Sequence, residues 1–291
     1  MYSEIASNKR RSVIVIILFV LFVGLLGLLA SYYFTGRPYM TIGVLIGAAL
    51  YALIMYYSGS KLSLSINGAH EIQSSDNPRL WRIVENLAIT EGLSMPKVYI
   101  MDDPAPNAFA TGRDPSHAAV CATSGILEIM NDTELEGVFA HELGHVKNYD
   151  IRVSMIVFAL AAVVALIADV VLHTAFFRSD NKNSSPIFYI LAIAGAILAP
   201  LIASLIQLSI SRRREYLADA TGALATRYPE GLANALEKIG QYGRPLQKQN
   251  SSTAHLFFTN PLKSGKINNL FSTHPPIEDR IRRLREMGSH A

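Results

Sequence analysis

Four long apolar stretches alternate with polar segments along the chain. They cover Val13–Phe34, Met40–Tyr57, Val153–Leu172 and Ile187–Ile210. Each comes close to, or exceeds, the roughly 20 residues that an apolar α-helix needs to cross a bilayer. Gly36-Arg37-Pro38 breaks the chain between the first and second stretches. Pro186 directly precedes the fourth stretch, and proline is favoured in the first turn of a helix. The pattern therefore predicts four transmembrane helices arranged as two hairpins.

The hairpins divide the chain into four parts. We expect a transmembrane hairpin at residues 1–57, a polar segment at 58–152, a second hairpin at 153–210 and a polar segment at 211–291. The basic residues at 9–11, before the first stretch, also occur in signal peptides. That stretch is long and lacks a convincing small-residue cleavage site, which favours an uncleaved anchor.

The polar segments carry shorter helical and strand patterns. Apolar residues recur at helical spacing within residues 76–91, at Leu80, Ile83, Val84, Leu87 and Ala88. Lys97–Met101 and Ala118–Cys121 are β-favouring runs bounded by turn residues, which predicts two or three strands. Asn131, Asp132 and Thr133 offer N-cap chemistry, and Glu136, three residues after Thr133, resembles the second half of a capping box, which predicts a helix that begins there. The expected fold is mainly α-helical, with an α+β soluble domain joined to transmembrane helices.

Composition and charge indicate a membrane protein whose soluble part is cytoplasmic. Half of the residues are hydrophobic and only 17% are charged. Lys9–Arg11 and Arg212–Arg214 would flank the side that holds residues 58–152, and cytoplasmic flanks are enriched in basic residues. The single cysteine, Cys121, fits a reducing compartment and a buried apolar role. Because the basic residues form no patch interleaved with aromatics, nucleic-acid binding is excluded.

The candidate chemistry lies on the helix expected near residue 133, which contains His141-Glu142-Leu143-Gly144-His145. Residues i and i+4 share one helical face, so the two imidazoles can bind one Zn2+ ion. Glu142 lies near the same face and can act as the general base toward a water that zinc activates. Two histidines with structural roles only are the alternative, but the capped helix and its apolar remaining faces favour a zinc hydrolase.

A zinc hydrolase usually has a third protein ligand and leaves the fourth position to water. Metzincins would require Gly at 148 and His at 151, where this chain has Asn148 and Ile151. Gluzincins instead use a glutamate from a later helix, followed four residues on by an aspartate, and Glu215 and Asp219 have that spacing. Glu215 can then bind the metal while Asp219 accepts a hydrogen bond from a ligand histidine. A solvated helix face is the alternative for both carboxylates.

Membrane topology is expected to bring the two motifs together. The third apolar stretch begins eight residues after His145, and the fourth ends five residues before Glu215. An antiparallel hairpin returns the chain to the side that it left, so both ligand helices should emerge at one membrane face. Asp150 is the competing acidic ligand, but it is rotated by more than a quarter turn from the ligand face.

With these motifs the chain resembles the HtpX family of bacterial membrane metalloproteases, which is related to the prenyl-protein peptidases of the eukaryotic endoplasmic reticulum. The resemblance covers essentially all 291 residues: two spans, H-E-x-x-H, two spans, E-x-x-x-D and a Thr-His-Pro-Pro segment. It implies a zincin-like domain at the cytoplasmic face of the bacterial inner membrane, with one Zn2+ per chain. It also implies proteolysis of misfolded or damaged membrane proteins, with other quality-control proteases as possible partners.

The resemblance also assigns roles that spacing alone does not. In such enzymes the asparagine of an Asn-Ala-Phe-Ala-Thr-Gly stretch lies beside the bound peptide, which indicates Asn107 as a substrate-binding residue. His274 and Arg280 belong to the family's terminal motif and would stabilise the oxyanion. Without the resemblance, Asn107 is equally well a turn residue, and the other two a loop residue and part of a basic helix.

An exposed sheet edge is the expected binding place for substrate polypeptides, and the strand at Ala118–Ala122 is the candidate edge. Main-chain pairing of this kind suits a degrader of many proteins. Two rival functions remain: a processing protease for one membrane-anchored substrate, and a non-catalytic membrane adaptor. The intact set of His141, Glu142, His145 and Glu215 argues against the adaptor.

Overall fold

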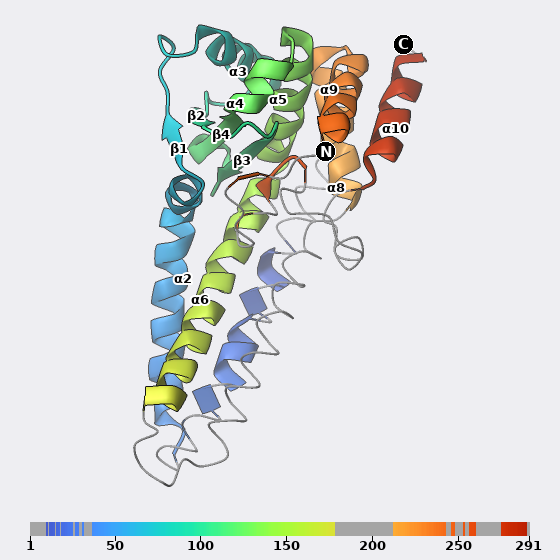
Figure 1. Ribbon diagram of the computed structural model, residues 1–291. Helices are drawn as coiled ribbons and strands as arrows, with labels where there is room; N and C mark the ends of the chain where they lie inside the picture. The colour runs from blue at the N-terminus through green and yellow to red at the C-terminus, as the bar shows by residue number, and fades with distance from the viewer. Residues whose placement is uncertain are drawn as a thin grey trace.

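The computed structural model describes residues 37–177, 212–242, 246–247, 256–259 and 275–289, with Thr253 and helical residues scattered between 10 and 31. The predicted fourth span at 187–210 and His274 lie outside the described residues, and the first span is described only in part. The described chain forms a globular domain from which two long helices extend on the same side (Figure 1).

The two long helices are α2 (Tyr39–Ile66) and α6 (Asp150–Phe177). Among the described residues, Tyr39–Ile66 and Asp150–Ile167 are the helices long and apolar enough to cross a membrane. Large apolar side chains of α2 are exposed, namely Ile42, Ile46, Leu50, Leu53, Ile54 and Tyr57. Such a surface is unfavourable in water and suits contact with lipid.

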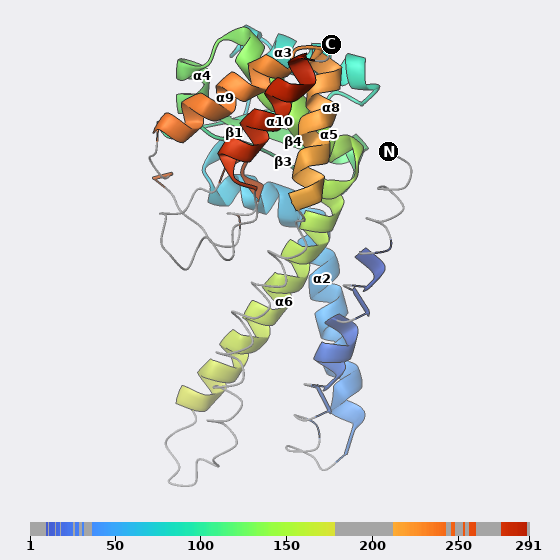
Figure 2. The same cartoon turned by 90° about the vertical axis from the view of Figure 1, so that its right-hand side faces the viewer.

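A glycine allows α2 and α6 to approach each other near the globular domain. A Cβ at Gly59 would lie 2.8 Å from the Met155 sulfur and 3.1 Å from the Phe158 ring. These two side chains pack with Met55 and Ala159 in a small apolar cluster. Farther from the domain the helices diverge (Figure 2).

The sheet has four strands: β1 (Ala69–Glu71), β2 (Lys97–Met101), β3 (Ala108–Gly112) and β4 (Ala118–Thr123). Their order is β1-β2-β4-β3, with β2 and β4 parallel and the other pairs antiparallel. The two predicted strands are therefore present as β2 and β4. The predicted substrate edge at Ala118–Ala122 is wrong, because β4 is hydrogen-bonded on both sides and β3 is the outer strand.

The remaining elements are α3 (Pro78–Glu91), the short 3-10 helix η1 (Pro115–His117), α4 (Ser124–Ile129), α5 (Asp132–Lys147), α8 (Arg212–Thr226), α9 (Pro229–Tyr242) and α10 (Ile277–Ser289). Helix α5 is central, since it contacts α3, α8, α9 and β3. Helix α3 buries the apolar face expected of it, and Asn77 caps its first turn by accepting a hydrogen bond from the Leu80 backbone N–H.

Helix α5 begins with a capping box at Asn131, one of the three predicted N-cap residues, and its partner is Glu134. The Asn131 side chain accepts a hydrogen bond from the Glu134 N–H at 3.0 Å, and the Glu134 carboxylate accepts one from the Asn131 N–H at 2.9 Å. The predicted pair, Thr133 and Glu136, is wrong because the helix starts at Asp132, so that Thr133 already lies inside it. The cap anchors the helix that carries both site histidines.

Candidate metal centre

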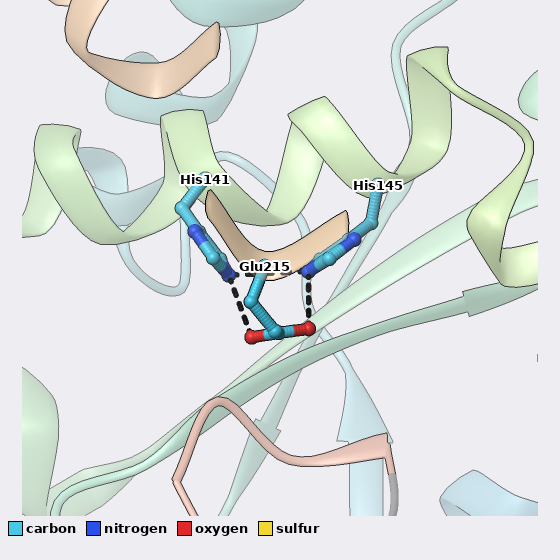
Figure 3. A group of neighbouring side chains, drawn as sticks. All are labelled: His141, His145 and Glu215. Atoms are coloured by element: carbon cyan, nitrogen blue, oxygen red, sulfur yellow. Dashed lines mark hydrogen bonds and ion pairs between the residues drawn. The ribbon is translucent and has the colours of Figure 1, made fainter. Parts of the chain in front are cut away.

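Two helices place three metal-binding side chains around one point (Figure 3). His141 and His145 come from α5 and Glu215 from the first turn of α8. The two Nε2 atoms are 3.1 Å apart, and the Glu215 carboxylate oxygens lie 3.8 Å from His141 Nε2 and 3.5 Å from His145 Nε2. Tetrahedral zinc with bonds of about 2.1 Å holds its ligand atoms roughly 3.4 Å apart. The three side chains therefore fit Zn2+ with one position left open.

A carboxylate holds the second ring nitrogen of each histidine. Asp219 lies 2.9 Å from His141 Nδ1, as the spacing predicted, and Asp150 lies 2.9 Å from His145 Nδ1. Such partners fix the tautomer, so that each Nε2 faces the metal position with its lone pair. The sequence suggested Asp150 only as a competing metal ligand. In the structure it instead orients the ring of the ligand His145.

The environments of the two rings differ in their effect on protonation. Burial lowers the pKa of His141 to about 4, which keeps this ring neutral and able to bind a metal. Burial also disfavours the charged form of His145, but its hydrogen bond to Asp150 and the charge of Glu215 outweigh that effect and raise its pKa to about 9. Metal binding therefore requires His145 to lose a proton.

Arg280 from α10 secures Asp219. Its guanidinium nitrogens lie 2.9 Å and 2.7 Å from the two Asp219 oxygens, and one lies 3.4 Å from His141 Nδ1. Burial opposes ionisation of Asp219, but the Arg280 charge outweighs it and holds the carboxyl pKa well below its usual range. The structure thus brings Arg280 into the site through Asp219, and its predicted oxyanion role stays a prediction.

An arginine that sequence reasoning missed holds the other carboxylate. Arg214 Nη1 lies 3.2 Å from Asp150 Oδ1, and both side chains are buried. In the sequence, Arg214 is the last of three consecutive arginines, which indicated only membrane topology. Its position directly before Glu215 was the signal available for a role in the site.

The close packing of α5 and α8 depends on a second glycine. A Cβ at Gly222 would lie 2.9 Å from the His141 backbone nitrogen and 3.2 Å from the Ala140 carbonyl carbon. Because no side chain separates the helices at this point, α8 can place Glu215 and Asp219 directly against α5.

Glu142 faces the same site from α5 and is 2% exposed. Burial raises its pKa to about 7, and a hydrogen bond from the Ala110 backbone opposes the rise. A buried carboxyl group that shares a cavity with the metal position suits a general base. The contact with Ala110 also shows that β3, the outer strand, borders the site, which the sequence pattern did not indicate.

A cavity joins the metal position to the start of the membrane-type helix α6. It is lined by the site residues together with Ala110, Ile151, Ser154, Leu256, Phe257 and Phe258. Its volume for water-sized molecules is about 40 Å³, and a water molecule needs only about 10–15 Å³. The site can therefore hold a reacting water beside Glu142.

Asn107, the predicted substrate-binding residue, lies directly before β3 and is 3% exposed. Its side-chain amide donates a hydrogen bond to the Thr259 carbonyl at 3.0 Å, and its side-chain oxygen accepts one from the Thr259 N–H at 3.2 Å. The residue therefore binds a peptide main chain, but in this structure that main chain is the protein's own.

The sequence model of peptidase family M48 matches residues 74–288. The chain belongs to this family. A "Protease HtpX homolog" of Tropheryma whipplei (strain Twist) is 54% identical over 290 residues, which is 99% of each chain. Another, from Lactobacillus helveticus, is 45% identical over 298 residues and covers 99% of this chain and 100% of the relative.

The M48 chain also shares its fold with a solved structure, S. mikatae Ste24p. The TM-score is 0.53 at 18% identity, over 98% of this chain and 67% of that one. The fold prediction is confirmed in part: the described residues are mostly helical, with two apolar helices long enough to span a membrane. The predicted family, the metalloprotease activity at a membrane and the zinc cofactor are confirmed.

Proposed function

We propose that this M48 peptidase is an endopeptidase that hydrolyses misfolded or damaged membrane proteins at the membrane surface. The observation that carries the proposal is the cavity, which Glu142 shares with Ile151 and Ser154 in the first turns of α6. A polypeptide segment that leaves the bilayer beside α6 would reach the site without leaving the membrane surface. The names of the bacterial relatives support the same activity.

The proposed chemistry divides the work among groups of this chain. Zn2+, held by His141, His145 and Glu215, supplies Lewis-acid polarisation of the peptide carbonyl and of a water. Glu142 accepts the proton of the attacking water and then donates it to the leaving amine nitrogen.

The carboxylates behind the ligands have an orienting role in this proposal. Asp219 and Asp150 hold the histidine rings, and Arg280 and Arg214 hold the carboxylates. His274 and Arg280 remain our candidates for stabilising the oxyanion, and Asn107 for binding the substrate main chain. The contacts of Arg280 support a role in positioning His141 through Asp219.

We further propose a complete topology of two hairpins at residues 1–57 and 153–210, with the catalytic parts at 58–152 and 211–291. The soluble domain would face the cytoplasm at the bacterial inner membrane. The direction of α2 and α6, which leave the globular domain on one side, supports this arrangement (Figure 1). The basic residues at 212–214, next to the fourth predicted span, support the cytoplasmic orientation.

The decisive experiment compares purified wild type with Glu142→Gln and with Glu128→Gln, a matched change at an exposed residue of α4 outside the site. All three proteins should bind about one zinc per chain. Cleavage of a denatured membrane protein should fall by about 10²–10⁴-fold in Glu142→Gln and stay unchanged in the control. A chelator should abolish wild-type cleavage, and zinc should restore it.

This assay and a comparison of total membrane-protein fragments decide between the alternatives. Undiminished cleavage by Glu142→Gln would overturn the proposed mechanism. If the active enzyme alters a single membrane protein when total membrane fragments are compared with and without it, a processing protease is the better description.

A further inference from the structure

Residues 256–259 lie along the outer strand next to the metal centre. Phe257 forms an antiparallel bridge with Phe109 of β3, and the Phe258 N–H donates a hydrogen bond to the Ala108 carbonyl at 2.8 Å. In Figure 1 the segment is the short red-brown piece beside β3. This is the pairing by which an extended peptide adds to a sheet edge.

Asn107 extends the pairing by one residue. It both donates to and accepts from the Thr259 main chain, which any residue except proline at this position would allow. The two Thr259 groups that the Asn107 side chain contacts both belong to the main chain. Asn107 can therefore recognise an extended peptide whatever its side chains. The residue predicted to bind substrate is thus occupied by Thr259.

The side chain of Phe258 fills an aromatic subsite at the metal centre. Its ring lies edge-on to the His141 ring, with centroids 5.0 Å apart, and the Arg280 guanidinium lies 4.8 Å above it. Phe258 is 1% exposed, and Phe257 packs against Phe109 with ring centroids 4.8 Å apart. Phe257, Phe258 and Glu142 line the same cavity. The main chain that links the two phenylalanines therefore lies beside the catalytic groups.

We propose that Leu256–Thr259 occupies the peptide cleft as an intramolecular pseudosubstrate. A substrate polypeptide must displace it and place an aromatic or large aliphatic side chain where Phe258 lies, between His141 and Arg280. The inference rests on the peptidase function proposed above. Because a tethered segment competes at an effective concentration in the millimolar range, weakly binding peptides are excluded while extended apolar segments are admitted.

Displacement can be measured directly in Glu142→Gln, which should bind substrate without cleaving it. Hydrogen exchange at Phe258 should be slow in the free protein and at least tenfold faster when a saturating apolar peptide is added. Val98, inside the sheet, should not change. If the Phe258 amide stays protected while the peptide is bound, the segment is a fixed wall of the cleft and the proposal is wrong.

Substitution of Phe258 gives an independent test. Phe258→Ser weakens the hold of the segment on the subsite, so kcat/KM for a quenched peptide with Phe at the matching position should rise about three- to tenfold, mainly through KM. Zinc content should stay at the wild-type level. A structural role for Phe258 predicts a loss of activity instead.

Peptides test the subsite in the unaltered enzyme. A peptide containing Leu-Phe-Phe-Thr should inhibit competitively, and Leu-Phe-Ser-Thr should inhibit at least tenfold more weakly. Among substrates, Phe or Leu at this position should be preferred over Asp by tenfold or more. Equal inhibition by the two peptides and equal cleavage of the substrates would overturn the pseudosubstrate proposal. If cleavage still requires zinc and Glu142, the proposed peptidase function stands.

Discussion

Gly222→Ala should separate α8 from α5 and weaken zinc binding. The new Cβ would lie 2.9 Å from the His141 backbone nitrogen, a distance that side chains in folded proteins do not adopt. Both atoms at the contact belong to the interior of the domain, so the clash can be relieved only by moving one helix. Such a movement shifts Glu215 and Asp219 relative to His141.

The size of the effect follows from two opposing contributions. Overpacking in a close-packed interior costs about 1–3 kcal/mol, and Ala in place of Gly inside a helix stabilises by about 1 kcal/mol. The free energy of unfolding should therefore fall by up to about 2 kcal/mol. Zinc affinity is the more sensitive measure, because ligand distances tolerate only about 0.2 Å, and it should fall about tenfold or more.

Gly240→Ala is the matched control. This glycine is exposed on α9, and a Cβ there would meet nothing closer than Ile277 Cγ2 at 3.8 Å. Thermal unfolding in detergent and zinc competition with a chelator of known affinity should be measured for both variants. Equal stability and equal zinc affinity in the two would refute the conclusion that close helix packing at Gly222 sets the ligand geometry.

Two further changes separate metal binding from stability. Asp150→Asn keeps the shape but removes the charge that holds His145, so zinc affinity should fall about 10–100-fold by chelator competition, whereas exposed Asp102→Asn should leave it unchanged. Asn131→Ala removes the cap of α5 and should lower the free energy of unfolding by about 0.5–2 kcal/mol, measured by thermal or denaturant unfolding. If Asn131→Ala reduces the free energy of zinc binding by more than it reduces the free energy of unfolding, a purely capping role for Asn131 is contradicted.

Local spacing determines the parts of the structure that the sequence predicted. The i, i+4 positions of His141 and His145, and of Glu215 and Asp219, place each pair on one helical face whatever the rest of the chain does. The apolar face of α3 follows from periodicity in the same way, and its expected residues are buried.

Strand order and carboxylate partners depend on contacts between distant segments. All five residues of β3 and all six of β4 are buried, so both faces of both strands are covered and their side chains do not reveal which strand is the outer one. The contact of Asp150 with His145 likewise depends on the turn after α5, where Tyr149 adopts a φ of 61° and redirects the chain into α6. A helical-wheel estimate that continues α5 past this turn misplaces Asp150.

The buried charges around the site give an independent reason for a divalent metal. Six ionisable side chains other than the histidines are at most 5% exposed there: Glu142, Asp150, Glu215, Asp219, Arg214 and Arg280. Four carboxylates against two guanidinium groups leave two negative charges in a region shielded from water, which is costly without compensation. One Zn2+ between neutral histidines balances them. Without the metal, protons can compensate: the hydrogen bond to Asp150 and the charge of Glu215 raise the pKa of His145 to about 9, and burial raises that of Glu142 to about 7. Arg214 and Arg280 hold the carboxylates that orient the ligand histidines. By neutralising part of the negative charge of the site, they also determine how much positive charge the metal ion must supply.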